Sequence, residues 1–175
     1  NGVLEYARVE NRSVKLDIQK TTVSTLLETI REHCAGRCDD AGKKLVLDVD
    51  GLGSSTIVTD AKLLRQVVTN LIDNACKHTR GADDPTITVR ANAQPGDKIS
   101  VEVEDHGPGI DSSDRQHIFR PYRRARTGEP SSSGGIGLGL SLAKSWARLL
   151  GGNLELAPHT GRGTCFRLTV PRSRR

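Results

Sequence analysis

Aromatic side chains are scarce in this sequence, which has one tryptophan, two tyrosines and two phenylalanines among 175 residues. Proteins that bind single-stranded nucleic acid stack the bases on aromatic side chains within a basic groove. The chain carries a net charge of +5, with arginines gathered at 115–126 and 171–175. Such charge suits phosphate-bearing ligands in general. Because the aromatics are too few for a stacking surface, we expect no nucleic acid as a partner.

Long apolar runs are also lacking, since a membrane-spanning helix needs about 20 consecutive apolar residues. The sequence begins with Asn1 rather than methionine and has no charged-then-apolar leader. We therefore interpret it as an excised piece, and we expect any membrane attachment to lie upstream.

The chain has four cysteines, scattered through periodic segments: Cys34, Cys38, Cys76 and Cys165. This scatter favours reduced, buried thiols over a disulfide framework, and it indicates a cytoplasmic domain. Cys34 and Cys38 lie next to His33 on a predicted helix, which raises the possibility of a metal site. Without a second ligand pair, packing in the core is the better interpretation.

Hydrophobic periodicity predicts one domain of mixed α/β class. Segment 2–11 has the pattern of a helix end, and Thr22 and Asp60 are predicted N-caps of two further helices. The first of these helices should end near Gly36, and another amphipathic helix should extend from Leu138 to Leu150. Alternation predicts strands, with a hairpin turn at 94–97, in the segments 14–18, 45–49, 87–89, 99–103, 153–156 and 164–170. The helices should cover one face of the sheet.

The segment 111–135 is polar and has no periodicity, which is typical of a mobile surface loop. We interpret it as a lid. Its flanks carry two of the four motifs described next.

The first motif, at 70–78, places Asn70, Asn74, Lys77 and His78 on one side of a helix, because spacings of three and four share a face. The second, at 101–110, places Asp105 at the end of a strand, next to glycines that let a flat ligand approach the backbone. A carboxylate there can accept a hydrogen bond from the exocyclic amine of adenine and so distinguish ATP from GTP. Taken alone, however, Asp105 could equally shape a Gly-Pro-Gly turn.

The third motif, at 118–124, combines Phe119 and Tyr122 with several arginines, and aromatics at this spacing are usually packing anchors. The fourth, at 134–140, is glycine-rich and opens a helix, so its free N–H groups could face an anion. The chain has neither the lysine motif of phosphate-binding loops nor the dinucleotide-binding pattern.

In this order the four motifs resemble the N, first-glycine, F and second-glycine boxes of sensor histidine kinase catalytic domains, which are of the HATPase or Bergerat type. Segment 160–166 is similar to the final glycine box of that family, so the resemblance extends from Val14 to Pro171. It implies a two-layer α/β sandwich with a mixed, mainly antiparallel sheet, and ATP held under the lid at 111–135. It also implies that 1–13 ends a dimerisation hairpin, that 14–171 is the catalytic domain and that 172–175 is a basic tail.

The resemblance also implies roles for single residues. Asn74 would coordinate Mg²⁺, Asp105 would hold adenine with Thr164 supporting it through water, and Lys77 and Arg124 would neutralise phosphate charge. His78 stands where the family often has tyrosine. Asn70, Lys77 and Arg124 are the implied catalytic residues. The implied nucleotide-binding residues are Asn70, Asn74, Lys77, His78, Asp105, Gly107, Gly109, Ile110, Phe119, Tyr122, Arg124, Gly135, Gly137, Leu138, Gly139, Leu140 and Thr164.

ATP-hydrolysing relatives of this fold carry a glutamate four residues before the metal-binding asparagine, where this chain has Asn70. A neutral amide cannot act as a general base, so transfer to another protein is favoured over hydrolysis. Serine kinases of the same fold usually keep the glutamate, which counts against them. A nucleotide-binding regulatory module without transfer activity is the remaining alternative.

No histidine in the chain is followed by an acidic residue, as the family's phosphoacceptor is. The resemblance therefore implies an acceptor on an upstream dimerisation domain of a homodimeric parent, with a response regulator as the next partner. We expect the isolated chain to be a monomer that binds Mg-ATP without phosphorylating itself.

Overall fold

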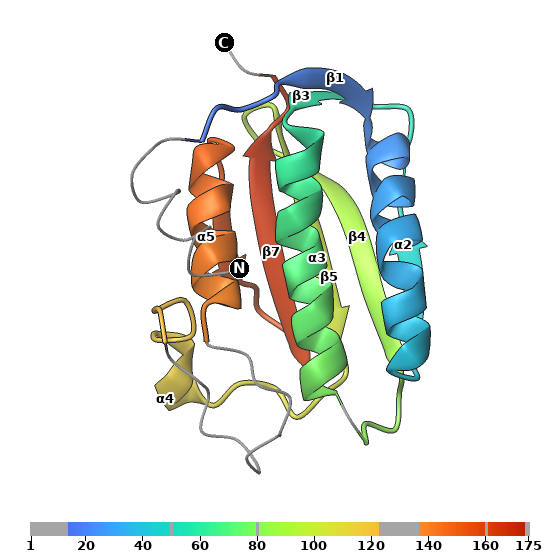
Figure 1. Ribbon diagram of the computed structural model, residues 1–175, viewed down its shortest axis with the longest axis vertical. Coiled ribbons are helices and arrows are strands. Elements are labelled where there is room, and N and C mark those ends of the chain that lie inside the picture. Colours follow the sequence, from blue (N-terminus) through green and yellow to red (C-terminus); the bar gives the residue numbers. More distant parts are fainter. Residues whose placement is uncertain (1–13, 50, 80, 123–136, 160, 174–175) are drawn as a thin grey trace.

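The computed structural model describes residues 14–49, 51–79, 81–122, 137–159 and 161–173 as one layer of helices on one layer of sheet (Figure 1). The helices are α2 (Val23–Asp40), α3 (Ala61–His78), α4 (Ser112–Arg115) and α5 (Gly139–Leu149). The strands are β1 (Gln19–Thr22), β2 (Lys44–Asp48), β3 (Thr56–Thr59), β4 (Thr86–Gln94), β5 (Lys98–Asp105), β6 (Asn153–Leu156) and β7 (Thr164–Pro171).

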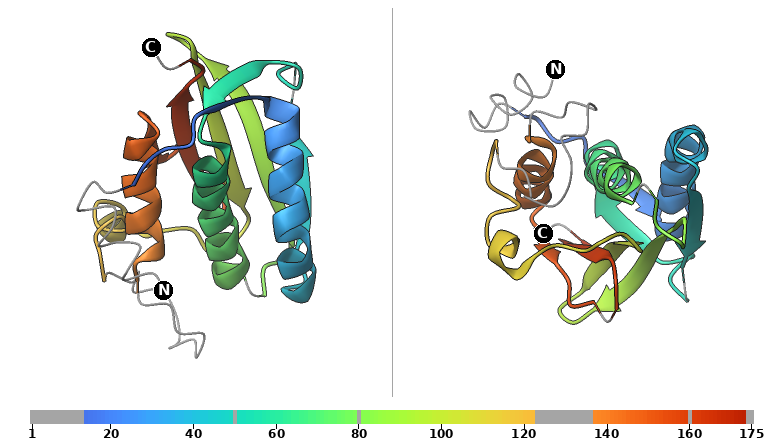
Figure 2. Two further views of the ribbon diagram at one scale, coloured as in Figure 1. Left: turned by 45° about the horizontal axis from the view of Figure 1, so that its top comes forward. Right: turned by 90° about the horizontal axis from the view of Figure 1, so that it is seen from below.

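The main sheet has five strands in the order β2-β4-β5-β7-β6. β2 pairs with β4 in parallel, and the other neighbours are antiparallel. Helices α2, α3 and α5 lie side by side on one face of this sheet, as the view along the helices shows (Figure 2, right). The mixed α/β class, the mainly antiparallel sheet and the one-sided helical layer are therefore confirmed.

Both predicted N-caps are confirmed. The backbone N–H of Thr25 donates to the side-chain oxygen of Thr22 over 3.2 Å, and that of Leu63 donates to Asp60 over 2.8 Å. Each bond satisfies one of the N–H groups that have no partner within the first turn of a helix. The apolar side of α3 then packs into the core with fully buried Leu64, Val67 and Leu71.

The structure differs from the sequence prediction in four places. Residues 14–18 form no strand; instead the N–H of Asp17 donates to Asp60 over 2.9 Å, and β1 begins at Gln19. β1 pairs with β3, a strand that the alternation pattern did not reveal because it has only four residues. Helix α2 continues four residues past Gly36, because Cys38 on its next turn is buried. The short helix α4 lies within the segment predicted to have no periodicity.

The face of the sheet away from the helices carries a row of alternating charges. Asp48, Arg90, Glu102, Arg167 and Glu155 are direct cross-strand partners on five consecutive strands. The closest contacts are Arg167 Nε to Glu102 at 2.7 Å and Arg90 Nε to Asp48 at 2.8 Å. Opposite charges on directly opposed residues stabilise a sheet, so this row links all five strands on the face opposite helices α2, α3 and α5.

Candidate functional site

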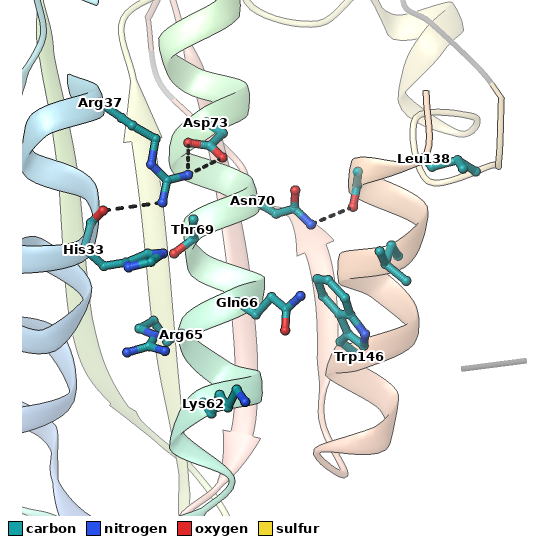
Figure 3. Close-up of a pocket in the computed structure, with 12 residues that line it drawn as sticks. His33, Arg37, Lys62, Arg65, Gln66, Thr69, Asn70, Asp73, Leu138 and Trp146 are labelled. Carbon is teal, nitrogen blue, oxygen red and sulfur yellow. Dashed lines mark hydrogen bonds and ion pairs between the residues drawn. The ribbon is translucent and has the colours of Figure 1, made fainter. Parts of the chain in front are cut away.

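The polar side of α3 faces the start of α5. The Nδ2 group of Asn70 donates to the carbonyl oxygen of Gly139 over 3.4 Å, although the two residues are 69 positions apart (Figure 3). Asn70 and Asn74 are half-buried, whereas Lys77 and His78 are exposed at the end of the helix. The first and fourth sequence motifs therefore meet in space.

Asp105 is the last residue of β5 and is only 5% exposed. The N–H of Gly107 donates to its Oδ1 over 2.9 Å. Burial raises the pKa of Asp105, while hydrogen bonds from the backbone of Gly107 and Thr164 work against that rise. Thr164 is its cross-strand partner on β7, so the predicted supporting residue lies next to the carboxylate.

His78 lies near this carboxylate. Its pKa is lowered, mainly by desolvation, and the charge of Lys77 adds to that effect while the charge of Asp105 opposes it. The imidazole is therefore neutral at physiological pH. A neutral ring can accept or donate one hydrogen bond at this position.

The glycines around Asp105 allow parts of the protein to approach one another closely. A Cβ added at Gly107 would lie 3.0 Å from Asp105 Oδ1 and 3.1 Å from the carbonyl oxygen of His78. At Gly163, where φ is +129°, it would lie 2.0 Å from the carbonyl oxygen of Asp105. At Gly109, where φ is +82°, it would lie 3.1 Å from the carbonyl oxygen of Gly163. The loop after β5 is thus fixed between the end of α3 and the turn before β7, with Ile110 half-buried after it.

The glycine-rich start of α5 has the geometry that the sequence predicted. Gly137 has a φ of +73°, and the N-cap residue Leu138 makes no side-chain capping bond. The first N–H groups of a helix have no acceptor within that helix, and the helix dipole makes its start attractive to anions. Gly139 is exposed and Leu140 is half-buried, so the N-terminal end of this helix is open.

The two aromatics of the third motif behave differently. Phe119 packs edge-on against Phe166, with ring centroids 6.1 Å apart, and Lys144 Nζ lies 4.9 Å from its ring centre. Phe119 is therefore a packing anchor, as predicted. Tyr122 is 64% exposed and is not an anchor; its N–H donates to the carbonyl oxygen of Gly137 over 3.1 Å.

Some predicted site residues and segments lie outside the described residues. These are Arg124, Gly135, most of the predicted lid and segment 1–13.

The structure also brings together residues that the sequence analysis did not select. A cavity of about 380 Å³ opens beside Asn70 and Gly139 and reaches across α3 to α2 (Figure 3). Its basic lining residues are His33, Arg37, Lys62 and Arg65. The spacing of Lys62, Gln66, Asn70 and Asp73 along α3 is a signal that could have identified this side of the helix.

Two interactions hold the far end of α3. Lys43 is buried and donates from Nζ to the carbonyl oxygen of Thr79 over 2.6 Å. Arg37 Nη1 donates to both carboxylate oxygens of Asp73, over 2.8 Å to Oδ2 and 3.0 Å to Oδ1. Both cations come from α2 or the turn after it, so this part of the chain positions the end of the helix that carries Asn74 and Lys77.

The fold and these motifs define an ATP-binding domain of the histidine kinase type. The family model described as "Histidine kinase-, DNA gyrase B-, and HSP90-like ATPase" matches residues 59–174, and the chain belongs to this family. It is 30% identical over 97% of its length to the aerobic respiration control sensor protein ArcB of Escherichia coli. It is also 30% identical over 98% of its length to the sensor histidine kinase MtrB of Mycobacterium tuberculosis.

Solved structures agree with this assignment. Full-length ShkA in complex with AMPPNP matches with a TM-score of 0.81 and 26% identity, over 98% of this chain and 34% of that one. The catalytic domain of histidine kinase ThkA, at 19% identity, shares the fold with a TM-score of 0.72 over 90% of this chain and 98% of that one. The chain spans only 22% of ArcB and 29% of MtrB. Within the described ranges, no helix is long and apolar enough to cross a membrane.

Proposed function

We propose that this chain is the phosphoryl-donor domain of a two-component sensor kinase. It binds Mg-ATP and transfers the γ-phosphoryl group to a histidine on the dimerisation domain of the same parent protein, for relay to a response regulator. Of the supporting relatives, MtrB is a sensor histidine kinase by name and ArcB a sensor protein. The observation that carries the proposal is Asn70, a neutral amide that donates to the carbonyl of Gly139 beside the cavity. It cannot take a proton from water, so hydrolysis has no general base at this position.

Asp105 suits the adenine end of the nucleotide. Its buried carboxylate is an acceptor-only group when ionised, and adenine presents an exocyclic amine as donor. The bond from Gly107 occupies Oδ1 and holds the carboxylate in one orientation. A guanine carbonyl in the same position would leave this buried acceptor facing another acceptor, which is strongly unfavourable. We therefore assign Asp105 to adenine recognition, with Thr164 beside it.

Asn74 suits the metal. Mg²⁺ takes oxygen ligands and is often held by one or two protein groups together with phosphate oxygens and water. The amide oxygen of Asn74 is of this type and lies on the half-buried side of α3, one turn after Asn70. When bound, the ion would neutralise phosphate charge. The protein contributes the position of this oxygen on a rigid helix.

The phosphates suit the space between the ends of α3 and α5. The open helix start at 137–140 supplies backbone N–H groups, and Lys77 supplies a flexible cation on the facing helix. We assign the exposed Tyr122 and the neutral His78 as further nucleotide contacts. Arg124 and Gly135 complete the proposed set, with Arg124 as a second cation.

The proposal includes the organisation of the parent protein. Residues 14–171 form the donor domain, 1–13 join it to the dimerisation hairpin, and 172–175 are a basic tail. We expect the parent to be a homodimeric, membrane-anchored sensor, with this domain in the cytoplasm as a monomeric unit. No histidine of the chain precedes an acidic residue, so the isolated domain should not phosphorylate itself.

A transfer experiment tests the proposal. The chain is mixed with the dimerisation hairpin of its parent and with ATP labelled in the γ position. We expect acid-labile label on the hairpin and none on the chain alone, and no transfer with Asn74→Ala. A chain that binds ATP but leaves the hairpin unlabelled would instead be a nucleotide-binding regulatory module.

A further inference from the structure

Two cysteines from different helices are in direct contact next to the proposed site. Cys38 lies in the last turn of α2, and Cys76 lies two residues after Asn74 on α3. Their Sγ atoms are 3.9 Å apart. Cys38 is fully buried, and Cys76 keeps 9% of its surface exposed. Neither has a part in the proposed binding of nucleotide.

The two thiols are unequally accessible. Cys76 keeps part of its surface exposed, whereas Cys38 is fully buried. Cys76 is therefore the thiol that a small oxidant can reach, and Cys38 is the second sulfur, in contact with it. The thiolate is the reactive form of cysteine, so Cys76 reacts through its ionised fraction.

The other two cysteines are in different situations. Cys34 contacts the hydroxyl of Thr69 at 3.5 Å, and burial raises its pKa. Cys165 lies on β7, and burial raises its pKa to about 11. Both are therefore protonated thiols at neutral pH. Cys165 provides a matched control, since it is as buried as Cys76 but makes no recorded contact with another sulfur.

We propose that Cys38 and Cys76 are a redox-active pair that a hydroperoxide converts into a disulfide between α2 and α3, and that this bond weakens nucleotide binding. The second half rests on the proposed function. The first half, the formation of the disulfide, concerns only the two sulfur atoms and does not depend on the proposed function.

The reaction balances with the hydroperoxide as oxidant. The Cys76 thiolate attacks the terminal peroxide oxygen, the O–O bond breaks, and the alkoxide leaves and takes up a proton to become an alcohol. Cys76 is then a sulfenic acid. The Cys38 sulfur attacks the Cys76 sulfur, the S–S bond forms, and the hydroxyl group leaves as water with the proton of Cys38. The two thiols lose two electrons, which reduce the peroxide.

The disulfide would change the geometry of the site through α3. A disulfide holds its sulfurs about 2.05 Å apart, so the two must approach from 3.9 Å. The regulatory half of the proposal is that part of this approach comes from a shift of the end of α3 towards α2. That end carries Asn74 and Lys77, and its next residue, Thr79, has a methyl carbon only 3.0 Å from the Cβ position of Gly107. Displacing the helix end therefore disturbs the loop that holds Asp105.

Mass spectrometry tests the first half on the wild-type chain. The reduced chain is treated with hydrogen peroxide, and free thiols are then blocked. We expect the loss of two hydrogen atoms per chain, reversed by dithiothreitol, and a cross-linked peptide pair containing Cys38 and Cys76. Cys165→Ser should react as the wild type does, whereas Cys76→Ser should form no cross-link. Failure to form the Cys38–Cys76 peptide pair would overturn the proposal, whatever the variants do.

Calorimetry with ATP tests the second half and separates it from the proposed function. We expect the oxidised chain to bind ATP about tenfold more weakly than the reduced chain, a usual size for coupling between two sites. Oxidised Cys76→Ser should bind as its reduced form does. Equal affinity of the reduced and cross-linked chains would overturn the regulatory half. A reduced chain that does not bind ATP would overturn the proposed function, and the peptide map would still decide whether the pair is redox-active.

Discussion

Asn70 and Gly139 lie at the meeting point of α3 and α5, where the asparagine Nδ2 donates to the glycine carbonyl oxygen over 3.4 Å. A Cβ at Gly139 would lie 3.4 Å from Asn70 Oδ1. The amide group is thus held with its nitrogen towards the backbone of α5. In the proposed function, this neutral amide stands where hydrolysis would need a base.

Replacing Asn70 by glutamate tests this interpretation. A carboxylate can take a proton from water, and a positioned general base contributes about 10²- to 10⁴-fold to a rate. We expect Asn70→Glu to raise the steady-state release of phosphate from ATP at least about tenfold. The control is Asn70→Gln, which has the same length but no basic group. A similar increase in both variants would show that the effect comes from shape.

Asp105→Asn should weaken ATP binding. The substitution replaces an acceptor by a group that is half donor, and it leaves the adenine amine without its charged partner. The expected loss is about 1–3 kcal/mol, the usual cost of an unpaired buried hydrogen-bonding group. Isothermal calorimetry measures it, with Glu104→Gln on the same strand as control. Unchanged affinity would remove Asp105 from the site.

The same substitution should stabilise the domain when no nucleotide is present. Burial raises the pKa of Asp105 above its ordinary value of 3.8. The stability that the Asp105 carboxyl group contributes is therefore fully present below pH 3.8, where the group is protonated. It is lost as the pH rises through the higher pKa of the folded state. Asparagine has no such loss. We expect Asp105→Asn to raise the free energy of unfolding at neutral pH by about 1 kcal/mol, a usual gain when a destabilising functional residue is replaced. Urea titrations should show the gain vanishing towards pH 3.8; a gain independent of pH would have another origin.

Asn74→Ala should abolish the dependence of ATP binding on Mg²⁺. The alanine variant loses the amide oxygen that we assign to the metal, and oxygen ligands are the ones that Mg²⁺ requires. Nucleotide titrations with and without Mg²⁺ should then give the same affinity for the variant but different affinities for the wild type. A variant that still responds to Mg²⁺ would place the metal ligand elsewhere.

The charged row on the open face of the sheet should contribute to stability at its centre and little at its edge. The Glu102 side chain is 12% exposed and receives a 2.7 Å hydrogen bond from Arg167. We expect Glu102→Gln to lower the free energy of unfolding by about 1.5–3 kcal/mol, the worth of a hydrogen bond to a charged group. The Glu155 side chain is 49% exposed and 3.9 Å from the same arginine. Glu155→Gln should therefore cost below about 1 kcal/mol. Chemical denaturation measures both, and equal losses would contradict this assignment.

Local patterns in the sequence determined the type and order of most elements. Thr22 and Asp60 marked helix starts because a capping side chain bonds within three residues of itself. Alternation located β4, β5 and β7 because apolar residues recur at every second position along much of each strand. The motifs around Asn74, Asp105 and Gly139 indicated the family because each is a short contiguous segment that can be recognised in the sequence itself.

Tertiary structure decided which of these segments meet. The pairing of β1 with β3, the exposure of Tyr122, and the contacts of Asn70 with Gly139 and of Cys38 with Cys76 all depend on packing. Periodicity reports only whether one face of one element is buried. It does not report which distant atoms lie opposite, because that depends on how whole helices and strands fit together. The four motifs therefore identified the kind of protein, whereas only the fold could show that two thiols from α2 and α3 lie next to the proposed nucleotide site.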